Sequence, residues 1–167
     1  MFTKEKYLSD YKSNLEKHSA ELTKNIKSIT LLKYKEEIEL LDFTVFTDLL
    51  SLHIVVDGMD RYATQYMFDP DIEKDIFYGN IQLLGETTYF SVSEDEEDTF
   101  WEFYEASEEE LNKREQIILA EWFANCWSKA NGSSIGLPSY VGLHDYENCY
   151  DLVNKKWMNS EEKWNEE

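Results

Sequence analysis

His144, Asp145 and Cys149 are the side chains in this sequence best suited to nucleophilic chemistry. An imidazole beside a thiol can remove its proton, and a carboxylate can orient that imidazole. His144 and Cys149 are five positions apart, across a predicted turn at 146–148. Such a pair is easily found by chance, so the competing interpretation is that His144 and Asp145 hydrogen-bond the turn. A small enzyme using these three residues is therefore one alternative.

The sequence contains no other catalytic signature. It has no GxSxG or HExxH motif, no phosphate-binding GxxxxGK loop and no dinucleotide fingerprint. Cys126 and Cys149 lie 23 positions apart without a CxxC motif, which argues against a zinc site. We expect both to be reduced, buried thiols. The sequence predicts no catalytic residue, no cofactor and no metal site.

The segment DPDIEKD at 69–75 places carboxylates at alternate positions and invites a calcium interpretation. A calcium loop of the EF-hand type requires Gly at its sixth position and Glu at its twelfth. Here those positions hold Lys74 and Asn80. We therefore interpret Asp69-Pro70-Asp71 as a turn or a helix start, with Asp71 or its neighbours as the cap. The alternative is a divalent cation that binds nonspecifically to this acidic surface.

Acidic residues are most concentrated at 93–110, SEDEEDTFWEFYEASEEE, which has ten carboxylates, no base and four aromatic residues at its centre. Three interpretations compete. The stretch is a solvated loop and helix start, with acids favoured by the helix dipole; or an interface for a basic protein, with aromatic anchors; or a mimic of nucleic acid, in which carboxylates replace phosphates.

Two helices are predicted from apolar spacing. In residues 3–29, apolar side chains recur at spacings of three, four and seven positions. Residues 108–130 show a similar helical spacing. Ser107 and Glu110, three positions apart, form a capping-box signature at the start of this second helix. Asn131-Gly132 predicts the end of the second helix. The N-terminal helix is expected to pack on the domain, with binding to a partner or dimerisation as alternatives.

The remaining segments favour strands. Residues 30–50 are ambiguous: ITLLKYKEEIELL at 29–41 can form a helix, whereas 43–56 is better interpreted as a strand. Asp57-Gly58 predicts a turn, and 61–68 the partner strand of a hairpin. Residues 77–92 predict two short strands divided by Gly79-Asn80 and Gly85, and 139–146 and 149–154 predict two more. Residues 159–167 are expected to be a frayed tail. This order predicts one α+β domain over 1–167, with a mostly antiparallel sheet.

The charge distribution constrains the partners. The net charge is −19, and residues 41–112 hold nineteen acids against Arg61 and Lys74, a net charge of −17. Such a field repels nucleic acid and anionic lipid and attracts cationic partners. The N-terminus lacks an apolar signal region and no apolar run is long enough to span a membrane, so a cytoplasmic protein is expected.

The segment from Trp122 to Trp157 resembles the C-terminal part of small bacterial proteins, some of which are encoded beside secreted polymorphic toxins and are taken to be immunity proteins. The resemblance rests on WFANCWSKANG, PSY, LHDYENCYDL and the following Trp, about a fifth of the chain. It implies a cytoplasmic protein that binds and blocks a toxin domain, often a nuclease. It transfers no functional residue.

These observations favour a binding protein that neutralises a basic partner, such as a nuclease toxin, by covering its nucleic-acid site. The alternative in the same class is a DNA mimic, from a phage or mobile element, that blocks a DNA-binding enzyme. No direct nucleic-acid or membrane binding is expected, and the oligomeric state is left open. The predicted partner-binding residues are Glu94, Asp95, Glu96, Glu97, Asp98, Trp101, Glu102 and Tyr104.

Overall fold

Two N-terminal helices replace the single helix predicted over 3–29. In the computed structural model, which describes residues 1–48, 50–66, 74–77 and 79–165, α1 spans Lys4–Glu16 and α2 spans Ser19–Thr30. The prediction is therefore wrong at the break between them. The buried Leu15 and Leu22 lie seven positions apart, close to two helical turns. That spacing suits one helix or two, so the apolar pattern does not reveal the break.

Six strands form one sheet in the order β5-β3-β2-β6-β7-β8. All neighbours in this sheet are antiparallel except β2 and β6, which are parallel. A separate parallel pair joins β1 (Lys33–Tyr34) to β4 (Ile76–Phe77). The predicted α+β class with a mostly antiparallel sheet is confirmed. The six strands are Leu40–Asp48 (β2), Ser51–Met59 (β3), Asn80–Thr88 (β5), Ser139–Leu143 (β6), Asn148–Asp151 (β7) and Lys156–Asn159 (β8).

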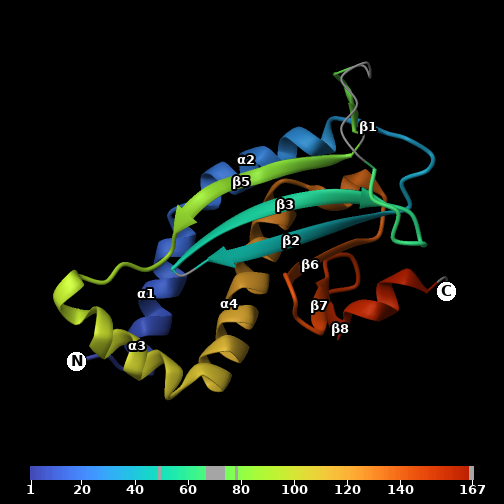
Figure 1. The fold of residues 1–167 in the computed structure, drawn as a ribbon. Helices are drawn as coiled ribbons and strands as arrows, with labels where there is room; N and C mark the ends of the chain where they lie inside the picture. Colours follow the sequence, from blue (N-terminus) through green and yellow to red (C-terminus); the bar gives the residue numbers. More distant parts are fainter. Residues whose placement is uncertain (49, 67–73, 78, 166–167) are drawn as a thin grey trace.

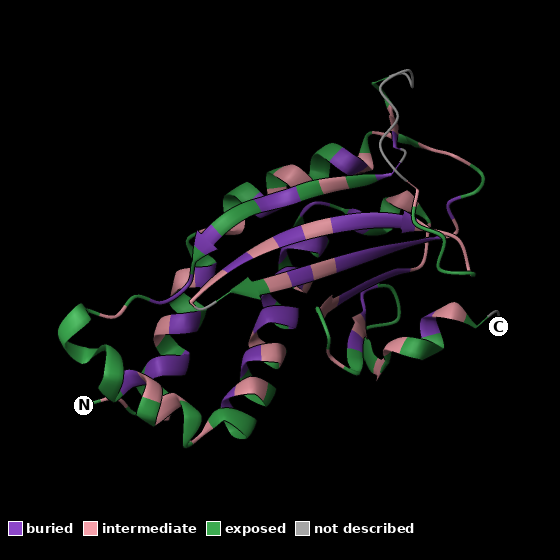
Figure 2. Ribbon diagram, viewed as in Figure 1, coloured by how far each residue is buried: buried purple, intermediate pink, exposed green. Residues whose placement is uncertain are grey.

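Helices α1, α2 and α4 (Glu108–Lys129) lie behind one face of the sheet (Figure 1). Alternate residues of β2 point into this layer, which is buried in Figure 2. The ring of Phe43 lies 5.0 Å from that of Phe123 and 5.4 Å from that of Trp127, both in α4. The core therefore sits between β2 and α4.

The long helix predicted over 108–130 is confirmed as α4. It ends at Lys129 with Ala130 as C-cap, and the next residue, Asn131, has the left-handed backbone (φ of 57°) expected after a helix end. The predicted capping box is wrong, because the Ser107 side chain makes no capping hydrogen bond. Glu108, Glu109 and Glu110 in the first turn favour the helix start by charge instead.

The turn predicted at Asp57-Gly58 is wrong, because both residues lie inside β3. Asp48 pairs with Ser51 across antiparallel β2 and β3, so 43–56 is not one strand. Gly58 is needed for packing rather than for turning. A β-carbon at Gly58 would lie 2.7 Å from the ring of Phe77 and 3.0 Å from Ile38.

The other predicted strand pairs also differ from the structure. Residues 61–66 form no strand, apart from a single bridge between Met59 and Gln65, and 67–68 lie outside the described residues. Residues 80–88 form one strand, β5, whose pairing shifts register opposite Leu52 and Ile54. Gly85 therefore sits in an irregular strand rather than between two strands.

The C-terminal region is more ordered than predicted. The strands expected over 139–146 and 149–154 are present as β6 and β7, and the expected frayed tail is wrong up to residue 165. A 3-10 helix, η3 (Ser160–Trp164), follows β8. Within it, the Lys163 ammonium donates to the Asp42 carboxylate in β2 at 2.6 Å. A buried ion pair thus holds η3 against the sheet.

Within the described parts of the chain, no helix has the length and apolar content needed to cross a bilayer.

Candidate functional site

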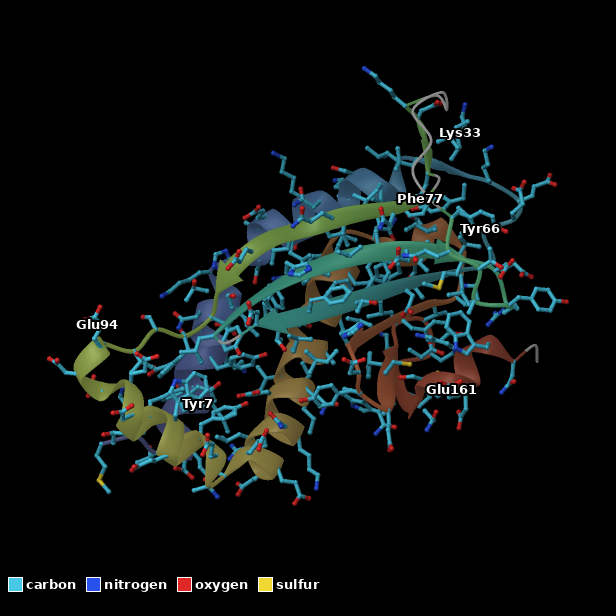
Figure 3. The ribbon with its side chains drawn as sticks, in the orientation of Figure 1. Tyr7, Lys33, Tyr66, Phe77, Glu94 and Glu161 are labelled. Carbon is cyan, nitrogen blue, oxygen red and sulfur yellow. The ribbon has the colours of Figure 1, made fainter. Side chains whose placement is uncertain are left out.

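The predicted binding stretch forms a projecting arm at one end of the molecule. We call residues 93–110 the acidic arm. It contains the 3-10 helix η1 (Glu94–Glu96), the helix α3 (Glu97–Glu105) and the first turn of α4. Figure 1 places α3 away from the sheet, at the lower left beside the lower ends of α1 and α4, and Figure 3 shows Glu94 at the tip of the arm.

Aromatic side chains hold the arm on the domain. Phe100 is fully buried in α3, and its ring lies 5.2 Å from the rings of Phe90 and Phe2 and 5.8 Å from that of Tyr7. Phe103 stacks on Phe2 with a ring separation of 5.9 Å. Rings in such contacts contribute about 0.5–1.5 kcal/mol per pair beyond the area they bury. The arm is therefore a packed part of the fold and not a loose acidic loop.

The carboxylates of the arm point to solvent. Six of the eight predicted binding residues are acids, all are exposed, and none forms an ion pair within the described part of the chain. Ser93 donates its hydroxyl to Glu96 at 3.0 Å, a neutral contact that leaves the charge in place. These six carboxylates are Glu94, Asp95, Glu96, Glu97, Asp98 and Glu102.

Some of the acidic residues of α3 do not stabilise the helix in which they lie. Glu97 and Asp98 lie in the first turn of α3, where the helix dipole stabilises anions. Glu102 and Glu105 lie near the C-terminal end of α3, where the dipole disfavours them, and no base sits in that last turn. Asp98 and Glu102 are also a like-charge pair at i and i+4, which destabilises a helix. The fold alone therefore does not explain these two glutamates.

The acids at the start of α4 behave differently. Lys113 donates to Glu109 at 2.7 Å, and Lys4 forms an ion pair with Glu110. The hydrogen bond and charge of Lys113 lower the pKa of Glu109, and those of Lys4 lower the pKa of Glu110. These glutamates are already neutralised by neighbours, so the unpaired charge is concentrated in η1 and α3.

Trp101 and Tyr104, the two aromatic residues predicted to bind a partner, are half-buried and pack against the core. The single proton of the Tyr104 hydroxyl is shared between two acceptors, a Glu115 carboxylate oxygen at 3.1 Å and the Asn112 side-chain oxygen at 2.9 Å. Burial, with Glu115 nearby, raises the pKa of Tyr104. Tyr104 is thus an internal support of the arm, while Trp101 lies beside its ring at 6.0 Å.

Glu115 is a buried titratable residue beside the acidic arm that the sequence did not single out. It is buried in α4 and accepts from Tyr7 at 2.6 Å as well as from Tyr104, where α1, α3 and α4 meet. Burial raises the pKa of its carboxyl, and the two tyrosine hydrogen bonds oppose the shift. The available signal was its spacing: Glu115 lies four positions from both Leu111 and Leu119, inside the apolar stripe.

The residues of the enzymatic alternative are not assembled into a thiol–imidazole pair. Cys149 is buried in β7 beside Leu40 and Tyr140, and burial raises the pKa of its thiol, which opposes formation of a thiolate. His144 is half-exposed, pairs with Asp145 at 3.0 Å and packs on Phe46 with a ring separation of 4.6 Å. No hydrogen bond joins His144 to Cys149 among the described residues.

The possible cation segment at 69–75 lies mainly outside the described residues, of which only 74 and 75 are placed. Asp75 pairs with Lys33 at 3.0 Å. Among the residues that the structure describes, no group of three or more His, Cys, Asp or Glu side chains could hold a metal ion.

Comparison with known proteins adds no relative: no protein-family model, curated protein or solved structure matches this chain.

Proposed function

We propose that this protein binds a basic protein partner through the acidic arm and covers the partner's nucleic-acid-binding surface. One observation carries the proposal: six exposed carboxylates without ion pairs within the described residues lie on a packed, projecting arm. A rigid arm presents these charges without the entropy cost of ordering a loop at the moment of binding.

The charges suit a partner rich in Lys and Arg. Complementary fields raise association rates by about 10–10³-fold, and nucleic-acid-binding surfaces carry the positive charge that this requires. Glu102 and Glu105, which destabilise α3, would gain their favourable contacts in the complex. Trp101, half-buried beside these acids, would complete the contact at the base of the arm.

The resemblance of residues 122–157 to immunity proteins supports a more specific form of the proposal, in which the partner is a nuclease toxin. That segment includes the C-terminal part of α4, the strands β6 and β7 and the first half of β8, and it contains no residue of the acidic arm. The resemblance therefore bears on the class of partner and not on the contacting residues.

The test begins with capture of partners from the native host, identified by mass spectrometry, using the wild type as bait. Association rates with the purified partner are then measured for the triple variant Glu96→Ser, Glu97→Ser, Asp98→Ser. The matched control, Glu36→Ser, Glu37→Ser, Glu147→Ser, removes the same charge from exposed sites outside the arm. A general effect of net charge would act equally on both variants.

We expect the arm variant to associate roughly 3–10-fold more slowly at low salt, with a weaker salt dependence, and the control to change much less. A nuclease partner should also lose its activity when bound by the wild type. Equal association rates for the wild type and the arm variant would remove the arm from the interface. Binding to several unrelated DNA-binding proteins would instead favour a DNA mimic.

A further inference from the structure

A second site of different character lies at the C-terminal end of the molecule, far along the chain from the acidic arm. A pocket of about 370 Å³ opens between the loop that precedes β6, the turn between β7 and β8, and η3. This region is at the lower right of Figure 1. The volume lies within the range of about 300–1,000 Å³ found for small-molecule sites.

Two buried residues form the polar floor of the pocket. Tyr140 in β6 and Asp151 in β7 are directly paired across the strands, so their side chains share one face of the sheet. The Asp151 carboxylate accepts from the backbone N–H groups of Val153 and Asn154 at 3.0 and 2.9 Å, and from the Asn154 side chain at 2.8 Å. Asp151 is therefore occupied in holding the turn.

Two cations line the same pocket, Arg61 and Lys156. The guanidinium of Arg61 donates to the Lys163 carbonyl and lies beside the Tyr140 hydroxyl. Burial raises the pKa of the Tyr140 phenol, and the hydrogen bond and charge of Arg61 oppose that shift. Across the parts of the chain that the structure describes, neither Arg61 nor Lys156 forms an ion pair.

Arg61 is half-buried, and no ion pair among the described residues balances its charge. The other arginine, Arg114, differs in this respect and lies 3.8 Å from the Glu110 carboxylate. A half-buried guanidinium presents several N–H donors in a fixed plane, and a carboxylate matches that plane with two oxygens. The pocket thus holds cationic donors that form no ion pair with the chain's own carboxylates among the described residues.

The rest of the lining restricts the anion. Pro138, Val153 and Met158 give the pocket an apolar wall, which favours a ligand with a short hydrocarbon part. Glu162 also lines the pocket, and the whole molecule carries a net charge of −19. Both repel a multiply charged ligand such as phosphate more than a singly charged one.

We infer that this pocket binds a small organic monocarboxylate, with the carboxylate at Arg61 and Lys156 and the hydrocarbon part against Val153 and Met158. This ligand class is separate from the protein partner proposed above, and the two sites can be tested independently because the pocket shares no residue with the acidic arm.

The test is a titration of the ¹⁵N-labelled full chain with 3-methylbutanoate, followed by amide chemical shifts, with inorganic phosphate as the second probe. We expect saturable shifts of the amides at 136, 137, 139 and 140 and at 151–156, with a dissociation constant at or below roughly 10 mM. Phosphate should give weaker shifts at the same concentration. Absence of saturable shifts at these amides, or equal binding of both probes, would overturn the inference.

Three variants complete the test. Arg61→Gln should weaken binding by about 10-fold or more, since a charge-assisted pair is lost. Because Arg61 also donates to η3, Lys156→Gln serves as a second variant at an exposed position and should weaken binding by about 3-fold. Lys155→Gln, the adjacent exposed lysine outside this pocket, is the control. Equal weakening by Lys155→Gln and Lys156→Gln would reduce the effect to net charge and contradict a site.

Discussion

The Tyr7 hydroxyl donates to the Glu115 carboxylate at 2.6 Å, across 108 positions of sequence, and Tyr104 donates to the same carboxylate from the acidic arm. One buried acid therefore connects α1, α3 and α4. Figure 3 shows Tyr7 at this junction, between the arm and the helices behind the sheet. The position of the arm depends on a group that is itself costly to bury in its charged form.

The first prediction concerns the pH dependence of stability. Burial raises the pKa of Glu115 above its ordinary value of 4.5. Below pH 4.5 the carboxyl is protonated in both folded and unfolded states. As the pH rises above 4.5, the unfolded chain loses this proton before the folded protein does, so this group's contribution to stability falls. Glu115→Gln removes this titrating group. The free energy of unfolding of the variant should therefore increase relative to that of the wild type as the pH rises.

Urea denaturation at several values between pH 4.5 and about pH 7 measures this difference. Glu121→Gln, at an exposed position of the same helix, controls for the loss of one negative charge. A constant difference between Glu115→Gln and the wild type across this interval would contradict the assignment of Glu115.

The second prediction tests the contact between the arm and α4. Tyr104→Phe keeps the ring and removes the hydroxyl, which leaves Glu115 with one tyrosine donor fewer. We expect a loss of about 1–2 kcal/mol in the free energy of unfolding. Hydrogen exchange should accelerate in α3 more than in the sheet, because the contact is local.

Tyr146→Phe provides the matched control, since the Tyr146 hydroxyl has no hydrogen-bond partner among the described residues and the ring is similarly half-buried. It should change stability by less than about 0.5 kcal/mol. If both variants lose the same stability, the hydroxyl of Tyr104 has no special role at the arm.

The third prediction concerns the C-terminal ion pair. The side chains of Asp42 and Lys163 are only 12% and 10% exposed, and their charged atoms lie 2.6 Å apart. Lys163→Met leaves the Asp42 carboxylate buried without its cation, which should cost about 3–5 kcal/mol. Adding Asp42→Leu removes the unpaired charge, so the double variant should recover much of this loss.

Thermal denaturation of the wild type, both single variants and the double variant gives the coupling energy between the two residues. Additive losses would mean that Lys163 stabilises η3 through its hydrocarbon chain and its contact with Trp164 alone, 4.8 Å from the ring centre.

The sequence predicts local features of this fold better than distant contacts. The helix α4 follows from apolar spacing and from Asn131, both local signals. Asp57-Gly58 misleads because the glycine is required by Phe77 packing against β3, which a dipeptide pattern cannot express. The pairing of Lys163 with Asp42 spans 121 positions, and a lysine near the end of an acidic chain carries no local sign of burial.

The candidate site, like the fold, is predictable from the sequence only where the signal is local. The sequence locates the acids of the arm, because their density is visible in a short window. It does not reveal which acids are neutralised by Lys4 or Lys113, because those contacts depend on how α1 and α4 pack. Nor does it separate the role of Tyr104 inside the fold from a role at a surface, since both need an aromatic residue beside acids.

The last prediction tests the close packing at the end of α4. A β-carbon on Gly132 would lie 2.2–2.4 Å from ring atoms of Trp127, which is itself buried against Phe43. Gly132→Ala should therefore lower the free energy of unfolding by about 1–3 kcal/mol, because either the Trp127 indole or the η2 turn (Gly132–Ile135) must move.

Gly85→Ala is the matched control. A β-carbon there has no neighbour closer than 3.9 Å, and alanine is more favourable than glycine in a strand by roughly 0.5–1 kcal/mol. Urea denaturation should show opposite signs for the two variants, and the near-UV circular dichroism of Trp127 should change only for Gly132→Ala. Equal stability of both variants would show that the end of α4 can expand around the indole, and that the glycine is not fixed by this contact.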